Sequence, residues 1–199
     1  MKELRFVLAS ASPRRRELLD LIGIPHVVDP ADIDESMHVA ELPVAHVERL
    51  AREKASKVAG RHHGALVIAA DTVVVLDGRV MGKPRTEDQA YDMLSDLSGA
   101  THTVLTGMAC AFNGELESSV DDVSVTFRSL SKDEIREYIA TGEPMDKAGS
   151  YGIQGYGATI VRRIDGDYFA VMGLSLVRLV ELMQKLRVRY HFGGATRHT

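Results

Sequence analysis

An aspartate interrupts the most apolar stretch of the sequence. Asp71 stands between VIAA and VVVL, so an extended apolar pattern continues on both sides of it. A carboxylate inside such a strand costs free energy unless it is paired or binds a cation. An aspartate in a turn at the end of a strand is the alternative, but it fits the continuing VVVL pattern poorly. We therefore predict that Asp71 does chemistry.

A second source of carboxylates is the polar segment DIDES. It carries Asp32, Asp34 and Glu35, with no histidine or cysteine at metal-ligand spacing. Carboxylates that come from separate segments suit a hard cation that prefers oxygen ligands. The sequence therefore predicts a divalent cation, Mg²⁺ or Mn²⁺, as cofactor.

Three arginines follow a predicted helix start in SASPRRRELL. Ser12 is expected to be the N-cap, and a helix N-terminus favours anions over cations. Arg16 can pair with Asp20 four residues on, whereas Arg14 and Arg15 have no acidic neighbour at that spacing. They form either a solvated cationic face or an anion cradle between a strand and a helix. The glycine spacing of Walker A and dinucleotide motifs is missing.

Isolated lysines and a glycine-flanked glutamine complete the candidate set. Lys83 lies in MGKP, Lys147 in MDKAG and Lys54 in REKA, where charged neighbours also allow a solvated position. Lysine binds phosphate as a point charge, so these cations and the carboxylates together favour a polyphosphate with a divalent ion. Gln154, in GIQG, both donates and accepts, which matches the imide edge of uracil or thymine, although the segment can also be an ordinary turn.

Two further residues have a structural interpretation. His102 lies in ATHTV, and a structural role is favoured over one facing a cleft, since the eight histidines show no metal spacing. Cys110 lies in GMACAF, where a buried, inert thiol is expected.

In the first part of the chain, predicted strands alternate with predicted helices, and in the later part predicted strands form hairpins. These elements must position the candidate residues. Strands are predicted at 5–9, 25–30, 65–71, 73–78, 101–112 and 118–130, and helices at 13–22, 44–60, 87–99, 131–142 and 174–188. Turn signals predict hairpins at 77–78, 113–114 and 165–166, and a capping box opens the helix at Ser131. The pattern predicts an α/β fold with a mixed β-sheet flanked by helices.

Composition limits the class of protein. The 199 residues are 45% hydrophobic and 26% charged with a net charge of -4, which is typical of a soluble globular protein and excludes a global basic field for nucleic acid. No apolar run reaches the roughly 18 residues of a membrane helix. The N-terminus has no cleavage region of a signal peptide, and one cysteine excludes an intramolecular disulfide, so a cytoplasmic location is expected.

The motifs taken together resemble the Maf-type nucleoside triphosphate pyrophosphatases. The resemblance runs in order through SASPRRRELL, RLAREKA, AADTVV, GKP, LSGATHTVLTG, TGEPMDKAGSYGIQG and VMGLSL. It implies an elongated sheet in an inosine triphosphate pyrophosphatase-like fold, with two lobes around a central cleft. Residues 1–190 would form this single domain, and 191–199 a flexible tail.

The resemblance also implies an activity and a set of residues. The family hydrolyses nucleoside triphosphates to the monophosphate and pyrophosphate with a divalent metal, and a homodimer is expected. Asp71 and Glu35 match its catalytic and metal-binding carboxylates. Its substrate-binding residues correspond to a larger set: Ser10, Ser12, Arg14, Lys54, Lys83 and Lys147.

Specificity follows the same resemblance. The branch that acts on dTTP and UTP is similar to this sequence at Arg14, Thr72 and Gln154. Two alternatives stay open: a pyrophosphatase for 7-methyl-GTP or another modified nucleotide, and a nucleotide-binding inhibitor of cell division.

Overall fold

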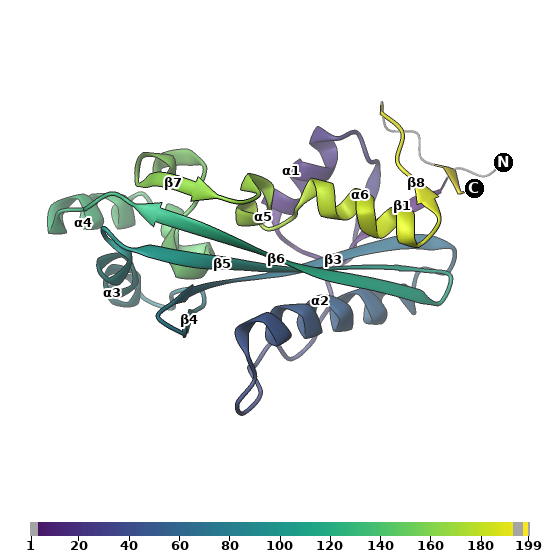
Figure 1. Cartoon of the computed structure of the whole chain (residues 1–199), viewed down its shortest axis with the longest axis horizontal. Coiled ribbons are helices and arrows are strands. Elements are labelled where there is room, and N and C mark those ends of the chain that lie inside the picture. The colour runs from purple at the N-terminus through teal and green to yellow at the C-terminus, as the bar shows by residue number, and fades with distance from the viewer. Residues whose placement is uncertain (1–3, 193–196, 199) are drawn as a thin grey trace. The chain divides into compact units, whose positions relative to one another are not determined.

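The computed structural model describes residues 4–192 and 197–198, and most of its elements are labelled in Figure 1. The chain divides into two compact units. The first comprises Met1–Asp71, Thr106–Asp121 and Gly173–Thr199, and the second comprises Thr72–Leu105 and Asp122–Met172. The chain has helices and a mixed sheet, so the predicted α/β class is confirmed. The cleft and the single-domain boundary at residue 190 stay predictions.

The first unit begins with parallel strand pairing. Strand β1 (Arg5–Leu8) pairs in parallel with β2 (His26–Val28) and with the start of β3 (Ala65–Leu76). Helix α1 (Pro13–Leu21) and helix α2 (Pro43–Ala59) make the two crossovers. Strands of this kind are covered on both faces, which explains why the segment 65–71 is buried throughout.

Helix α2 presents small residues to this sheet. Ala51 and Ala55 are buried in one cluster with Ala69 of β3 and with Ala109 and Ala111 of β5 (Thr101–Phe112). Small side chains allow a helix to approach a sheet closely. Such an approach is seen at Gly107, where an added Cβ would lie 2.2 Å from the carbonyl oxygen of Val47.

Two long strands run through both units. They are β5 (Thr101–Phe112) and β6 (Glu115–Phe127). The sheet order is β2-β1-β3-β5-β6-β7, in which β7 is Val161–Asp165, and β4 (Arg79–Met81) pairs with β3. Asn113 and Gly114, between β5 and β6, both have positive φ, 50° and 87°. This is the backbone that a tight hairpin turn requires, so the predicted turn at 113–114 is confirmed. The antiparallel pairing of β3 with β4 confirms the turn at 77–78.

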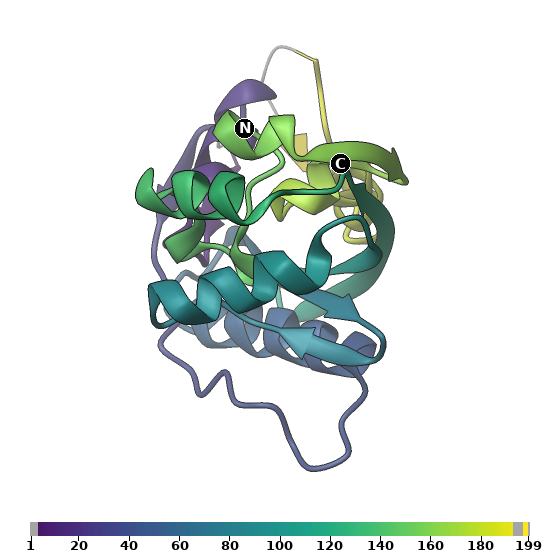
Figure 2. The same cartoon turned by 90° about the vertical axis from the view of Figure 1, so that its left-hand side faces the viewer.

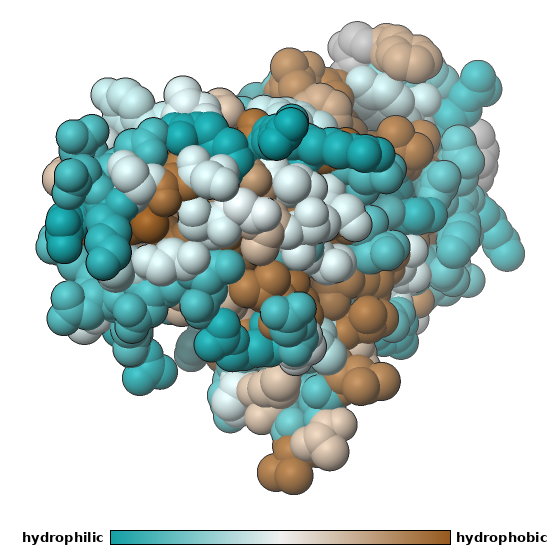
Figure 3. Space-filling model, turned by 60° about the vertical axis from the view of Figure 1, so that its left-hand side comes forward, coloured by the Kyte–Doolittle hydropathy of each residue, from teal (hydrophilic) through white to brown (hydrophobic). Residues whose placement is uncertain are grey.

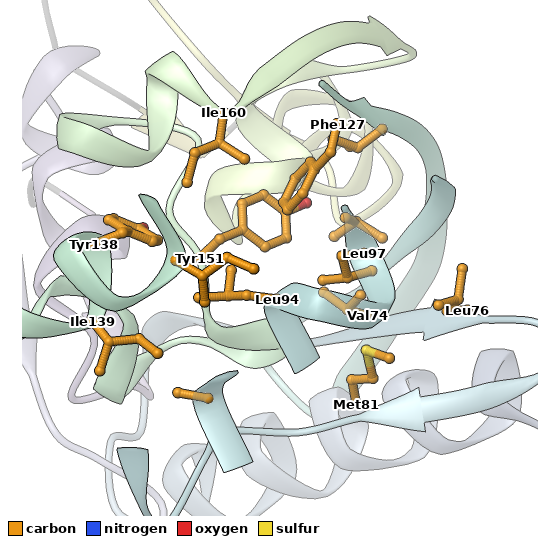
Figure 4. Packing of buried hydrophobic residues seen from close by; sticks show 14 of the residues in the cluster. Val74, Leu76, Met81, Leu94, Leu97, Phe127, Tyr138, Ile139, Tyr151 and Ile160 are labelled. Carbon is orange, nitrogen blue, oxygen red and sulfur yellow. The ribbon is translucent and has the colours of Figure 1, made fainter. Parts of the chain in front are cut away.

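The second unit has its own apolar core, shown in Figure 4. Helix α3 (Glu87–Leu97) and helix α4 (Lys132–Ala140) contribute to it, and the predicted capping box of Ser131 and Glu134 is present at the start of α4. Phe127 and Tyr151 meet edge to face, with ring centroids 4.6 Å apart. The segment after α4 forms three 3₁₀ helices: η1 (Glu143–Asp146), η2 (Ala148–Ser150) and η3 (Gly155–Thr159).

The predicted hairpin at 165–166 is wrong. Strand β7 (Val161–Asp165) is followed by a short helix, α5 (Tyr168–Met172), instead of a returning strand. The side chain of Asp167 accepts a hydrogen bond from the backbone N–H of Phe169 at 2.8 Å, and its carbonyl accepts from that of Val171 at 3.3 Å. These bonds start a helical turn in the sequence YFAVM, which its apolar pattern alone did not distinguish from a strand.

The C-terminal segment belongs to the first unit. Helix α6 (Leu176–Lys185) begins after Ser175, whose hydroxyl accepts from the N–H of Arg178 at 3.2 Å. Strand β8 (Val188–Arg189) then pairs with β9 (Arg197–His198). Residues 193–196 and 199 of the predicted tail lie outside the described residues. None of the described helices has the length and apolar character needed to cross a membrane.

Cys110 and His102 are both buried, as their structural interpretation requires. Burial raises the pKa of the Cys110 thiol to about 12, so the thiol stays protonated and inert. His102 lies between Phe127 and Tyr151, and its Nε2 is 2.8 Å from the Tyr151 hydroxyl. Among the described residues, its Nδ1 has no hydrogen-bond partner.

The burial of His102 predicts acid sensitivity. Desolvation lowers the pKa of His102 to about 4 from 6.5, so between these values the unfolded chain binds a proton that the folded chain does not. The contribution of His102 to the free energy of unfolding is therefore fully present above pH 6.5 and is lost as the pH drops toward 4. The loss amounts to about 3 kcal/mol over this pH range. Urea unfolding at pH 7 and pH 4.5 measures this, and His102→Gln should show a correspondingly shallower pH dependence. Equal pH dependence in both proteins would contradict it.

Candidate functional site

A buried lysine joins two carboxylates in the first unit. Lys54 on α2 is 7% exposed, and its Nζ lies 2.7 Å from Oδ1 of Asp71 and 2.6 Å from Oε1 of Glu35. Asp71 is 9% exposed on β3, whereas the side chain of Glu35 is 58% exposed. The structure thus brings together both predicted catalytic carboxylates and one predicted phosphate-binding cation.

The position of Lys54 follows from the face of α2 that it occupies. Leu50, Ala51, Ala55 and Val58 of this helix are buried, and Lys54 lies four residues after Leu50 and four before Val58. Residues at these spacings share one helix face. The lysine therefore points inward, and the alternative of a solvated position is wrong. Its ammonium group is compensated by the two carboxylates, as a buried charge requires.

The acidic segment that carries Glu35 is held by basic residues of the same helix. Arg49 binds Glu41 through two hydrogen bonds, Nε to Oε1 at 2.6 Å and Nη2 to Oε2 at 2.8 Å, and its Nη2 also donates to the carbonyl of Ser36 at 3.1 Å. Lys57 donates to the carbonyl of Asp32. The hydrogen bond from Arg49 holds the pKa of the Glu41 carboxyl far below its usual range. Sequence reasoning missed Glu41 and Arg49, because eight residues separate them and a loop and a helix contribute one each.

The same segment projects from the unit. Figure 2 shows the connection between β2 and α2 as a long irregular loop below α2. Its residues Met37, Val39 and Leu42 are exposed, in agreement with the hydrophobic surface on the lower protrusion of Figure 3. Of the three acidic candidates in the loop, Glu35 is the one at Lys54, whereas Asp34 accepts from the N–H of Ser36 at 2.9 Å.

The arginine-rich helix start is organised around Ser10. The buried Ser10 hydroxyl accepts from the N–H of Ser12 at 3.2 Å and from Nη1 of Arg15 at 3.1 Å. Nε of Arg15 donates to the carbonyl of Gly173 at 2.8 Å, so this arginine ties the loop after β1 to the segment before α6. Burial lowers the pKa of Arg15, while the nearby charges of Asp71 and Glu35 act in the opposite direction.

The other residues at the start of α1 are Ser12, Arg14 and Arg16. Ser12 is the N-cap of α1, as predicted, but its hydroxyl makes no capping hydrogen bond. Arg14 is half-buried in the first turn. The predicted pairing of Arg16 with Asp20 is wrong: no ion pair joins these two described residues, and Asp20 lies 3.8 Å from Nδ1 of His26.

The remaining predicted site residues belong to the second unit. Thr72 follows Asp71 on β3 and, because side chains alternate along a strand, it points to the opposite face. Lys83 is exposed after β4, and Gln154 is exposed just before η3. Nζ of Lys147 donates to the carbonyl of Glu143 and to Oδ1 of Asp146, both at 2.5 Å.

The carboxylates of the described residues can be compared with the ligands that a divalent cation requires. They contain no group of three or more histidine, cysteine, aspartate or glutamate side chains arranged to hold a metal. They do contain two carboxylates that converge on one cationic atom, Nζ of Lys54. Mg²⁺ is commonly held by one or two carboxylates together with substrate phosphates and water. Asp71 and Glu35 therefore fit such an ion when a phosphate-bearing substrate supplies the other oxygens.

The fold and this cluster define a mixed α/β protein in which a buried lysine lies between two carboxylates. Residues 5–186 match the family described as Maf-like protein. The chain therefore belongs to the Maf family, as its motifs predicted.

Relatives agree over most of the chain. A protein of Syntrophomonas wolfei named dTTP/UTP pyrophosphatase is 51% identical over 180 residues, which are 89% of this chain and 95% of the relative. A protein of Moorella thermoacetica with the same name is 53% identical over 90% of this chain and 93% of its own length. Among solved structures, the Ham1 protein of Staphylococcus aureus matches with 16% identity and a TM-score of 0.47 over 79% of each chain.

Proposed function

We propose that this protein is a nucleoside triphosphate pyrophosphatase that converts dTTP and UTP to the monophosphate and pyrophosphate. The observation that carries the proposal is the cluster of Asp71, Lys54 and Glu35, in a chain that belongs to the Maf family. The names of the relatives from Syntrophomonas and Moorella support the choice of substrates.

In the proposed reaction, water attacks the α-phosphorus. The bond between the α-phosphorus and the oxygen that bridges it to the β-phosphorus breaks, and pyrophosphate leaves with that oxygen. Asp71 orients the water and accepts its proton, because it is a carboxylate held in place by a hydrogen bond from Lys54. An ammonium group has three donors, and Asp71 and Glu35 take two of those on Lys54. The third can reach a phosphate oxygen and offset charge that develops as pyrophosphate leaves.

Further cations and hydroxyls would bind the phosphate chain. We assign this role to Arg14 at the start of α1 and to Lys83 and Lys147 of the second unit. Ser10 and Ser12 line the loop before α1, where backbone N–H groups favour an anion. Arg15, by contrast, supports the loop through Ser10 and Gly173.

Asp71 and Glu35 would hold the divalent cation, Mg²⁺ or Mn²⁺. When bound, the ion supplies positive charge against the phosphate oxygens of the substrate. The convergence of the two carboxylates on one cationic atom supports this assignment.

Base recognition is assigned to Thr72 and Gln154, with Arg14 as a third specificity position. The exposed amide of Gln154 can donate to and accept from the imide edge of uracil or thymine. A 7-methylguanine base lacks that edge, so the 7-methyl-GTP alternative predicts a different ranking of substrates.

A panel of ATP, ITP, 7-methyl-GTP, UTP and dTTP tests the proposal, with separate detection of pyrophosphate and of orthophosphate. UTP and dTTP should have the highest kcat/KM, and pyrophosphate should be the product. Orthophosphate as the first product would indicate a γ-phosphatase, and fastest turnover of 7-methyl-GTP would indicate the other substrate class. Tight binding without turnover would favour the nucleotide-binding inhibitor of cell division.

We also propose that the protein is a cytoplasmic homodimer with neither nucleic acid nor a membrane as partner. The net charge of -4 and the single, buried Cys110 support the location and the absence of nucleic acid. The dimer rests on the family resemblance, and size-exclusion chromatography with light scattering measures it.

A further inference from the structure

The glycine-rich segment that carries Gln154 is held by one carboxylate from another part of the second unit. Oε2 of Glu143 accepts from the backbone N–H of Tyr156 at 2.9 Å, and Oε1 accepts from that of Gly157 at 3.0 Å. Both amides lie in the first turn of η3, where N–H groups have no partner within the helix. Glu143 therefore caps this turn from outside.

Gln154 is the N-cap residue of η3, yet its side chain makes no capping hydrogen bond. The short side chains of Ser, Thr, Asp and Asn commonly bind the free N–H groups from this position, and a glutamine side chain is not among them. Since Glu143 already binds the N–H groups of Tyr156 and Gly157, the Gln154 amide is left exposed to solvent and available to a ligand.

A tyrosine binds the backbone of the segment on the other side of Gln154. The hydroxyl of Tyr138, on α4, donates to Oε1 of Glu143 at 2.8 Å and accepts from the N–H of Gly152 at 3.1 Å. Tyr138 is buried and is labelled beside Ile139 in Figure 4. Glu143 and Tyr138 thus fix the backbone both before and after Gln154.

The glycines on either side fit this arrangement. An added Cβ at Gly155, where φ is +65°, would lie 2.4 Å from Oε2 of Glu143. An added Cβ at Gly157 would lie 2.1 Å from the carbonyl oxygen of Gly152 and 2.7 Å from the hydroxyl of Tyr138. Only residues without side chains allow the backbone to come this close to Glu143 and Tyr138.

The ionisation state of the pair suits its role. Burial acts to raise the pKa of Glu143, but hydrogen bonds from Gly157, Tyr156 and Tyr138 hold it below its usual value. Burial raises the pKa of the Tyr138 phenol well above its usual value. At neutral pH the carboxylate is therefore charged and accepts, while the phenol is protonated and donates.

We propose that Glu143, with Tyr138, is a positioning residue for base recognition, since it fixes the backbone on both sides of Gln154 and leaves the amide free to read the base. The inference rests on the proposed function, in which Gln154 contacts uracil or thymine. Cytosine presents a different hydrogen-bonding edge, so the ratio of kcat/KM for UTP to that for CTP measures how well the amide is oriented.

Glu143→Gln tests the proposal because it keeps the shape of the side chain. An amide has one acceptor oxygen, and its NH₂ group would face an N–H donor of the loop. We expect KM for UTP to rise about tenfold with kcat changed less than about twofold, and the UTP/CTP ratio to fall about tenfold, the loss expected when one recognising hydrogen bond is misplaced. Tyr138→Phe should change the same quantities in the same direction by a smaller factor, and Glu143→Asp should partly restore the ratio.

A double variant separates positioning from a general loss of stability. If Glu143 acts through Gln154, Glu143→Gln combined with Gln154→Ala should have the same UTP/CTP ratio as Gln154→Ala alone. Glu134→Gln is the matched control, since it removes the capping carboxylate of α4 in the same unit. It should lower the melting temperature and leave the ratio unchanged.

Two results overturn the inference while the proposed function stands. One is a wild-type protein that prefers UTP together with Glu143→Gln and Tyr138→Phe variants that keep the full UTP/CTP ratio. The other is a double variant in which the two losses multiply. A wild-type protein that releases pyrophosphate without preference for UTP, or releases none, overturns the base-reading function and this inference with it.

Discussion

Replacing Asp71 by asparagine should lower pyrophosphate release from UTP by about two to three orders of magnitude, the usual effect of losing a positioned proton acceptor. The variant removes the negative charge and the basic oxygen pair but keeps the size of the side chain. Its amide oxygen can still accept from Nζ of Lys54, and Lys54 keeps Glu35 as a charged partner at 2.6 Å. No buried charge is left alone, so the melting temperature should change little.

The matched control for this variant is Asp77→Asn, in the turn that ends the same strand. Asp77 has a φ of 49°, and asparagine tolerates this left-handed conformation well. Steady-state kinetics with pyrophosphate detection should show near wild-type turnover for Asp77→Asn. Near wild-type turnover in Asp71→Asn would remove Asp71 from the proposed mechanism.

For Lys54, the sequence pattern predicts the burial of the side chain but not its partners. The apolar spacing of α2 was recognised from the sequence, and Lys54 falls within the apolar face that it defines. Its burial could therefore have been predicted by placing the lysine on that face, instead of by weighing its charged neighbours in sequence. Its pairing with both carboxylates could not, because Glu35 lies in a loop without periodicity and Asp71 on a strand that is distant in sequence.

The glycines around Gln154 carried a correct signal with a different cause. Glycines on both sides of Gln154 indicate that some group comes close to the backbone, and a ligand is one such group. The structure shows close contacts with Glu143 and Tyr138 of the same chain. Glycines in a sequence indicate that a group lies close to the backbone, but they do not identify that group. For this reason the sequence did not point to Glu143.

Turn chemistry was predictable where two successive residues demanded positive φ. Asn113 and Gly114 both adopt it, and the strands on either side pair with each other. At residues 165–166 only Gly166 has positive φ, 130°, and a helix follows. The deciding interaction there is the hydrogen bond between Asp167 and Phe169, which a pattern of apolar residues does not reveal.

Gly107→Ala should strongly destabilise the first unit. Its φ is not positive, so alanine can adopt the backbone conformation, and the whole effect is steric. The added Cβ would lie 2.2 Å from the carbonyl oxygen and 2.4 Å from the carbonyl carbon of Val47, and 2.8 Å from the N–H nitrogen of Glu48. These are backbone atoms of α2, which cannot rotate away as a side chain can. The helix must move as a body, which we expect to cost about 3 kcal/mol.

Gly82→Ala supplies the control, because its Cβ would meet no atom within 4 Å and its φ is not positive. Urea unfolding should place Gly82→Ala within about 0.5 kcal/mol of the wild type. Gly107→Ala should lose about 3 kcal/mol, or roughly 6–12 °C in melting temperature. Since α2 also carries Lys54 and Arg49, its displacement should lower pyrophosphate release even at temperatures where the variant is folded. Equal stability of the two alanine variants would show that α2 has room to move, and the close packing of α2 on β5 would then not hold Lys54 in place.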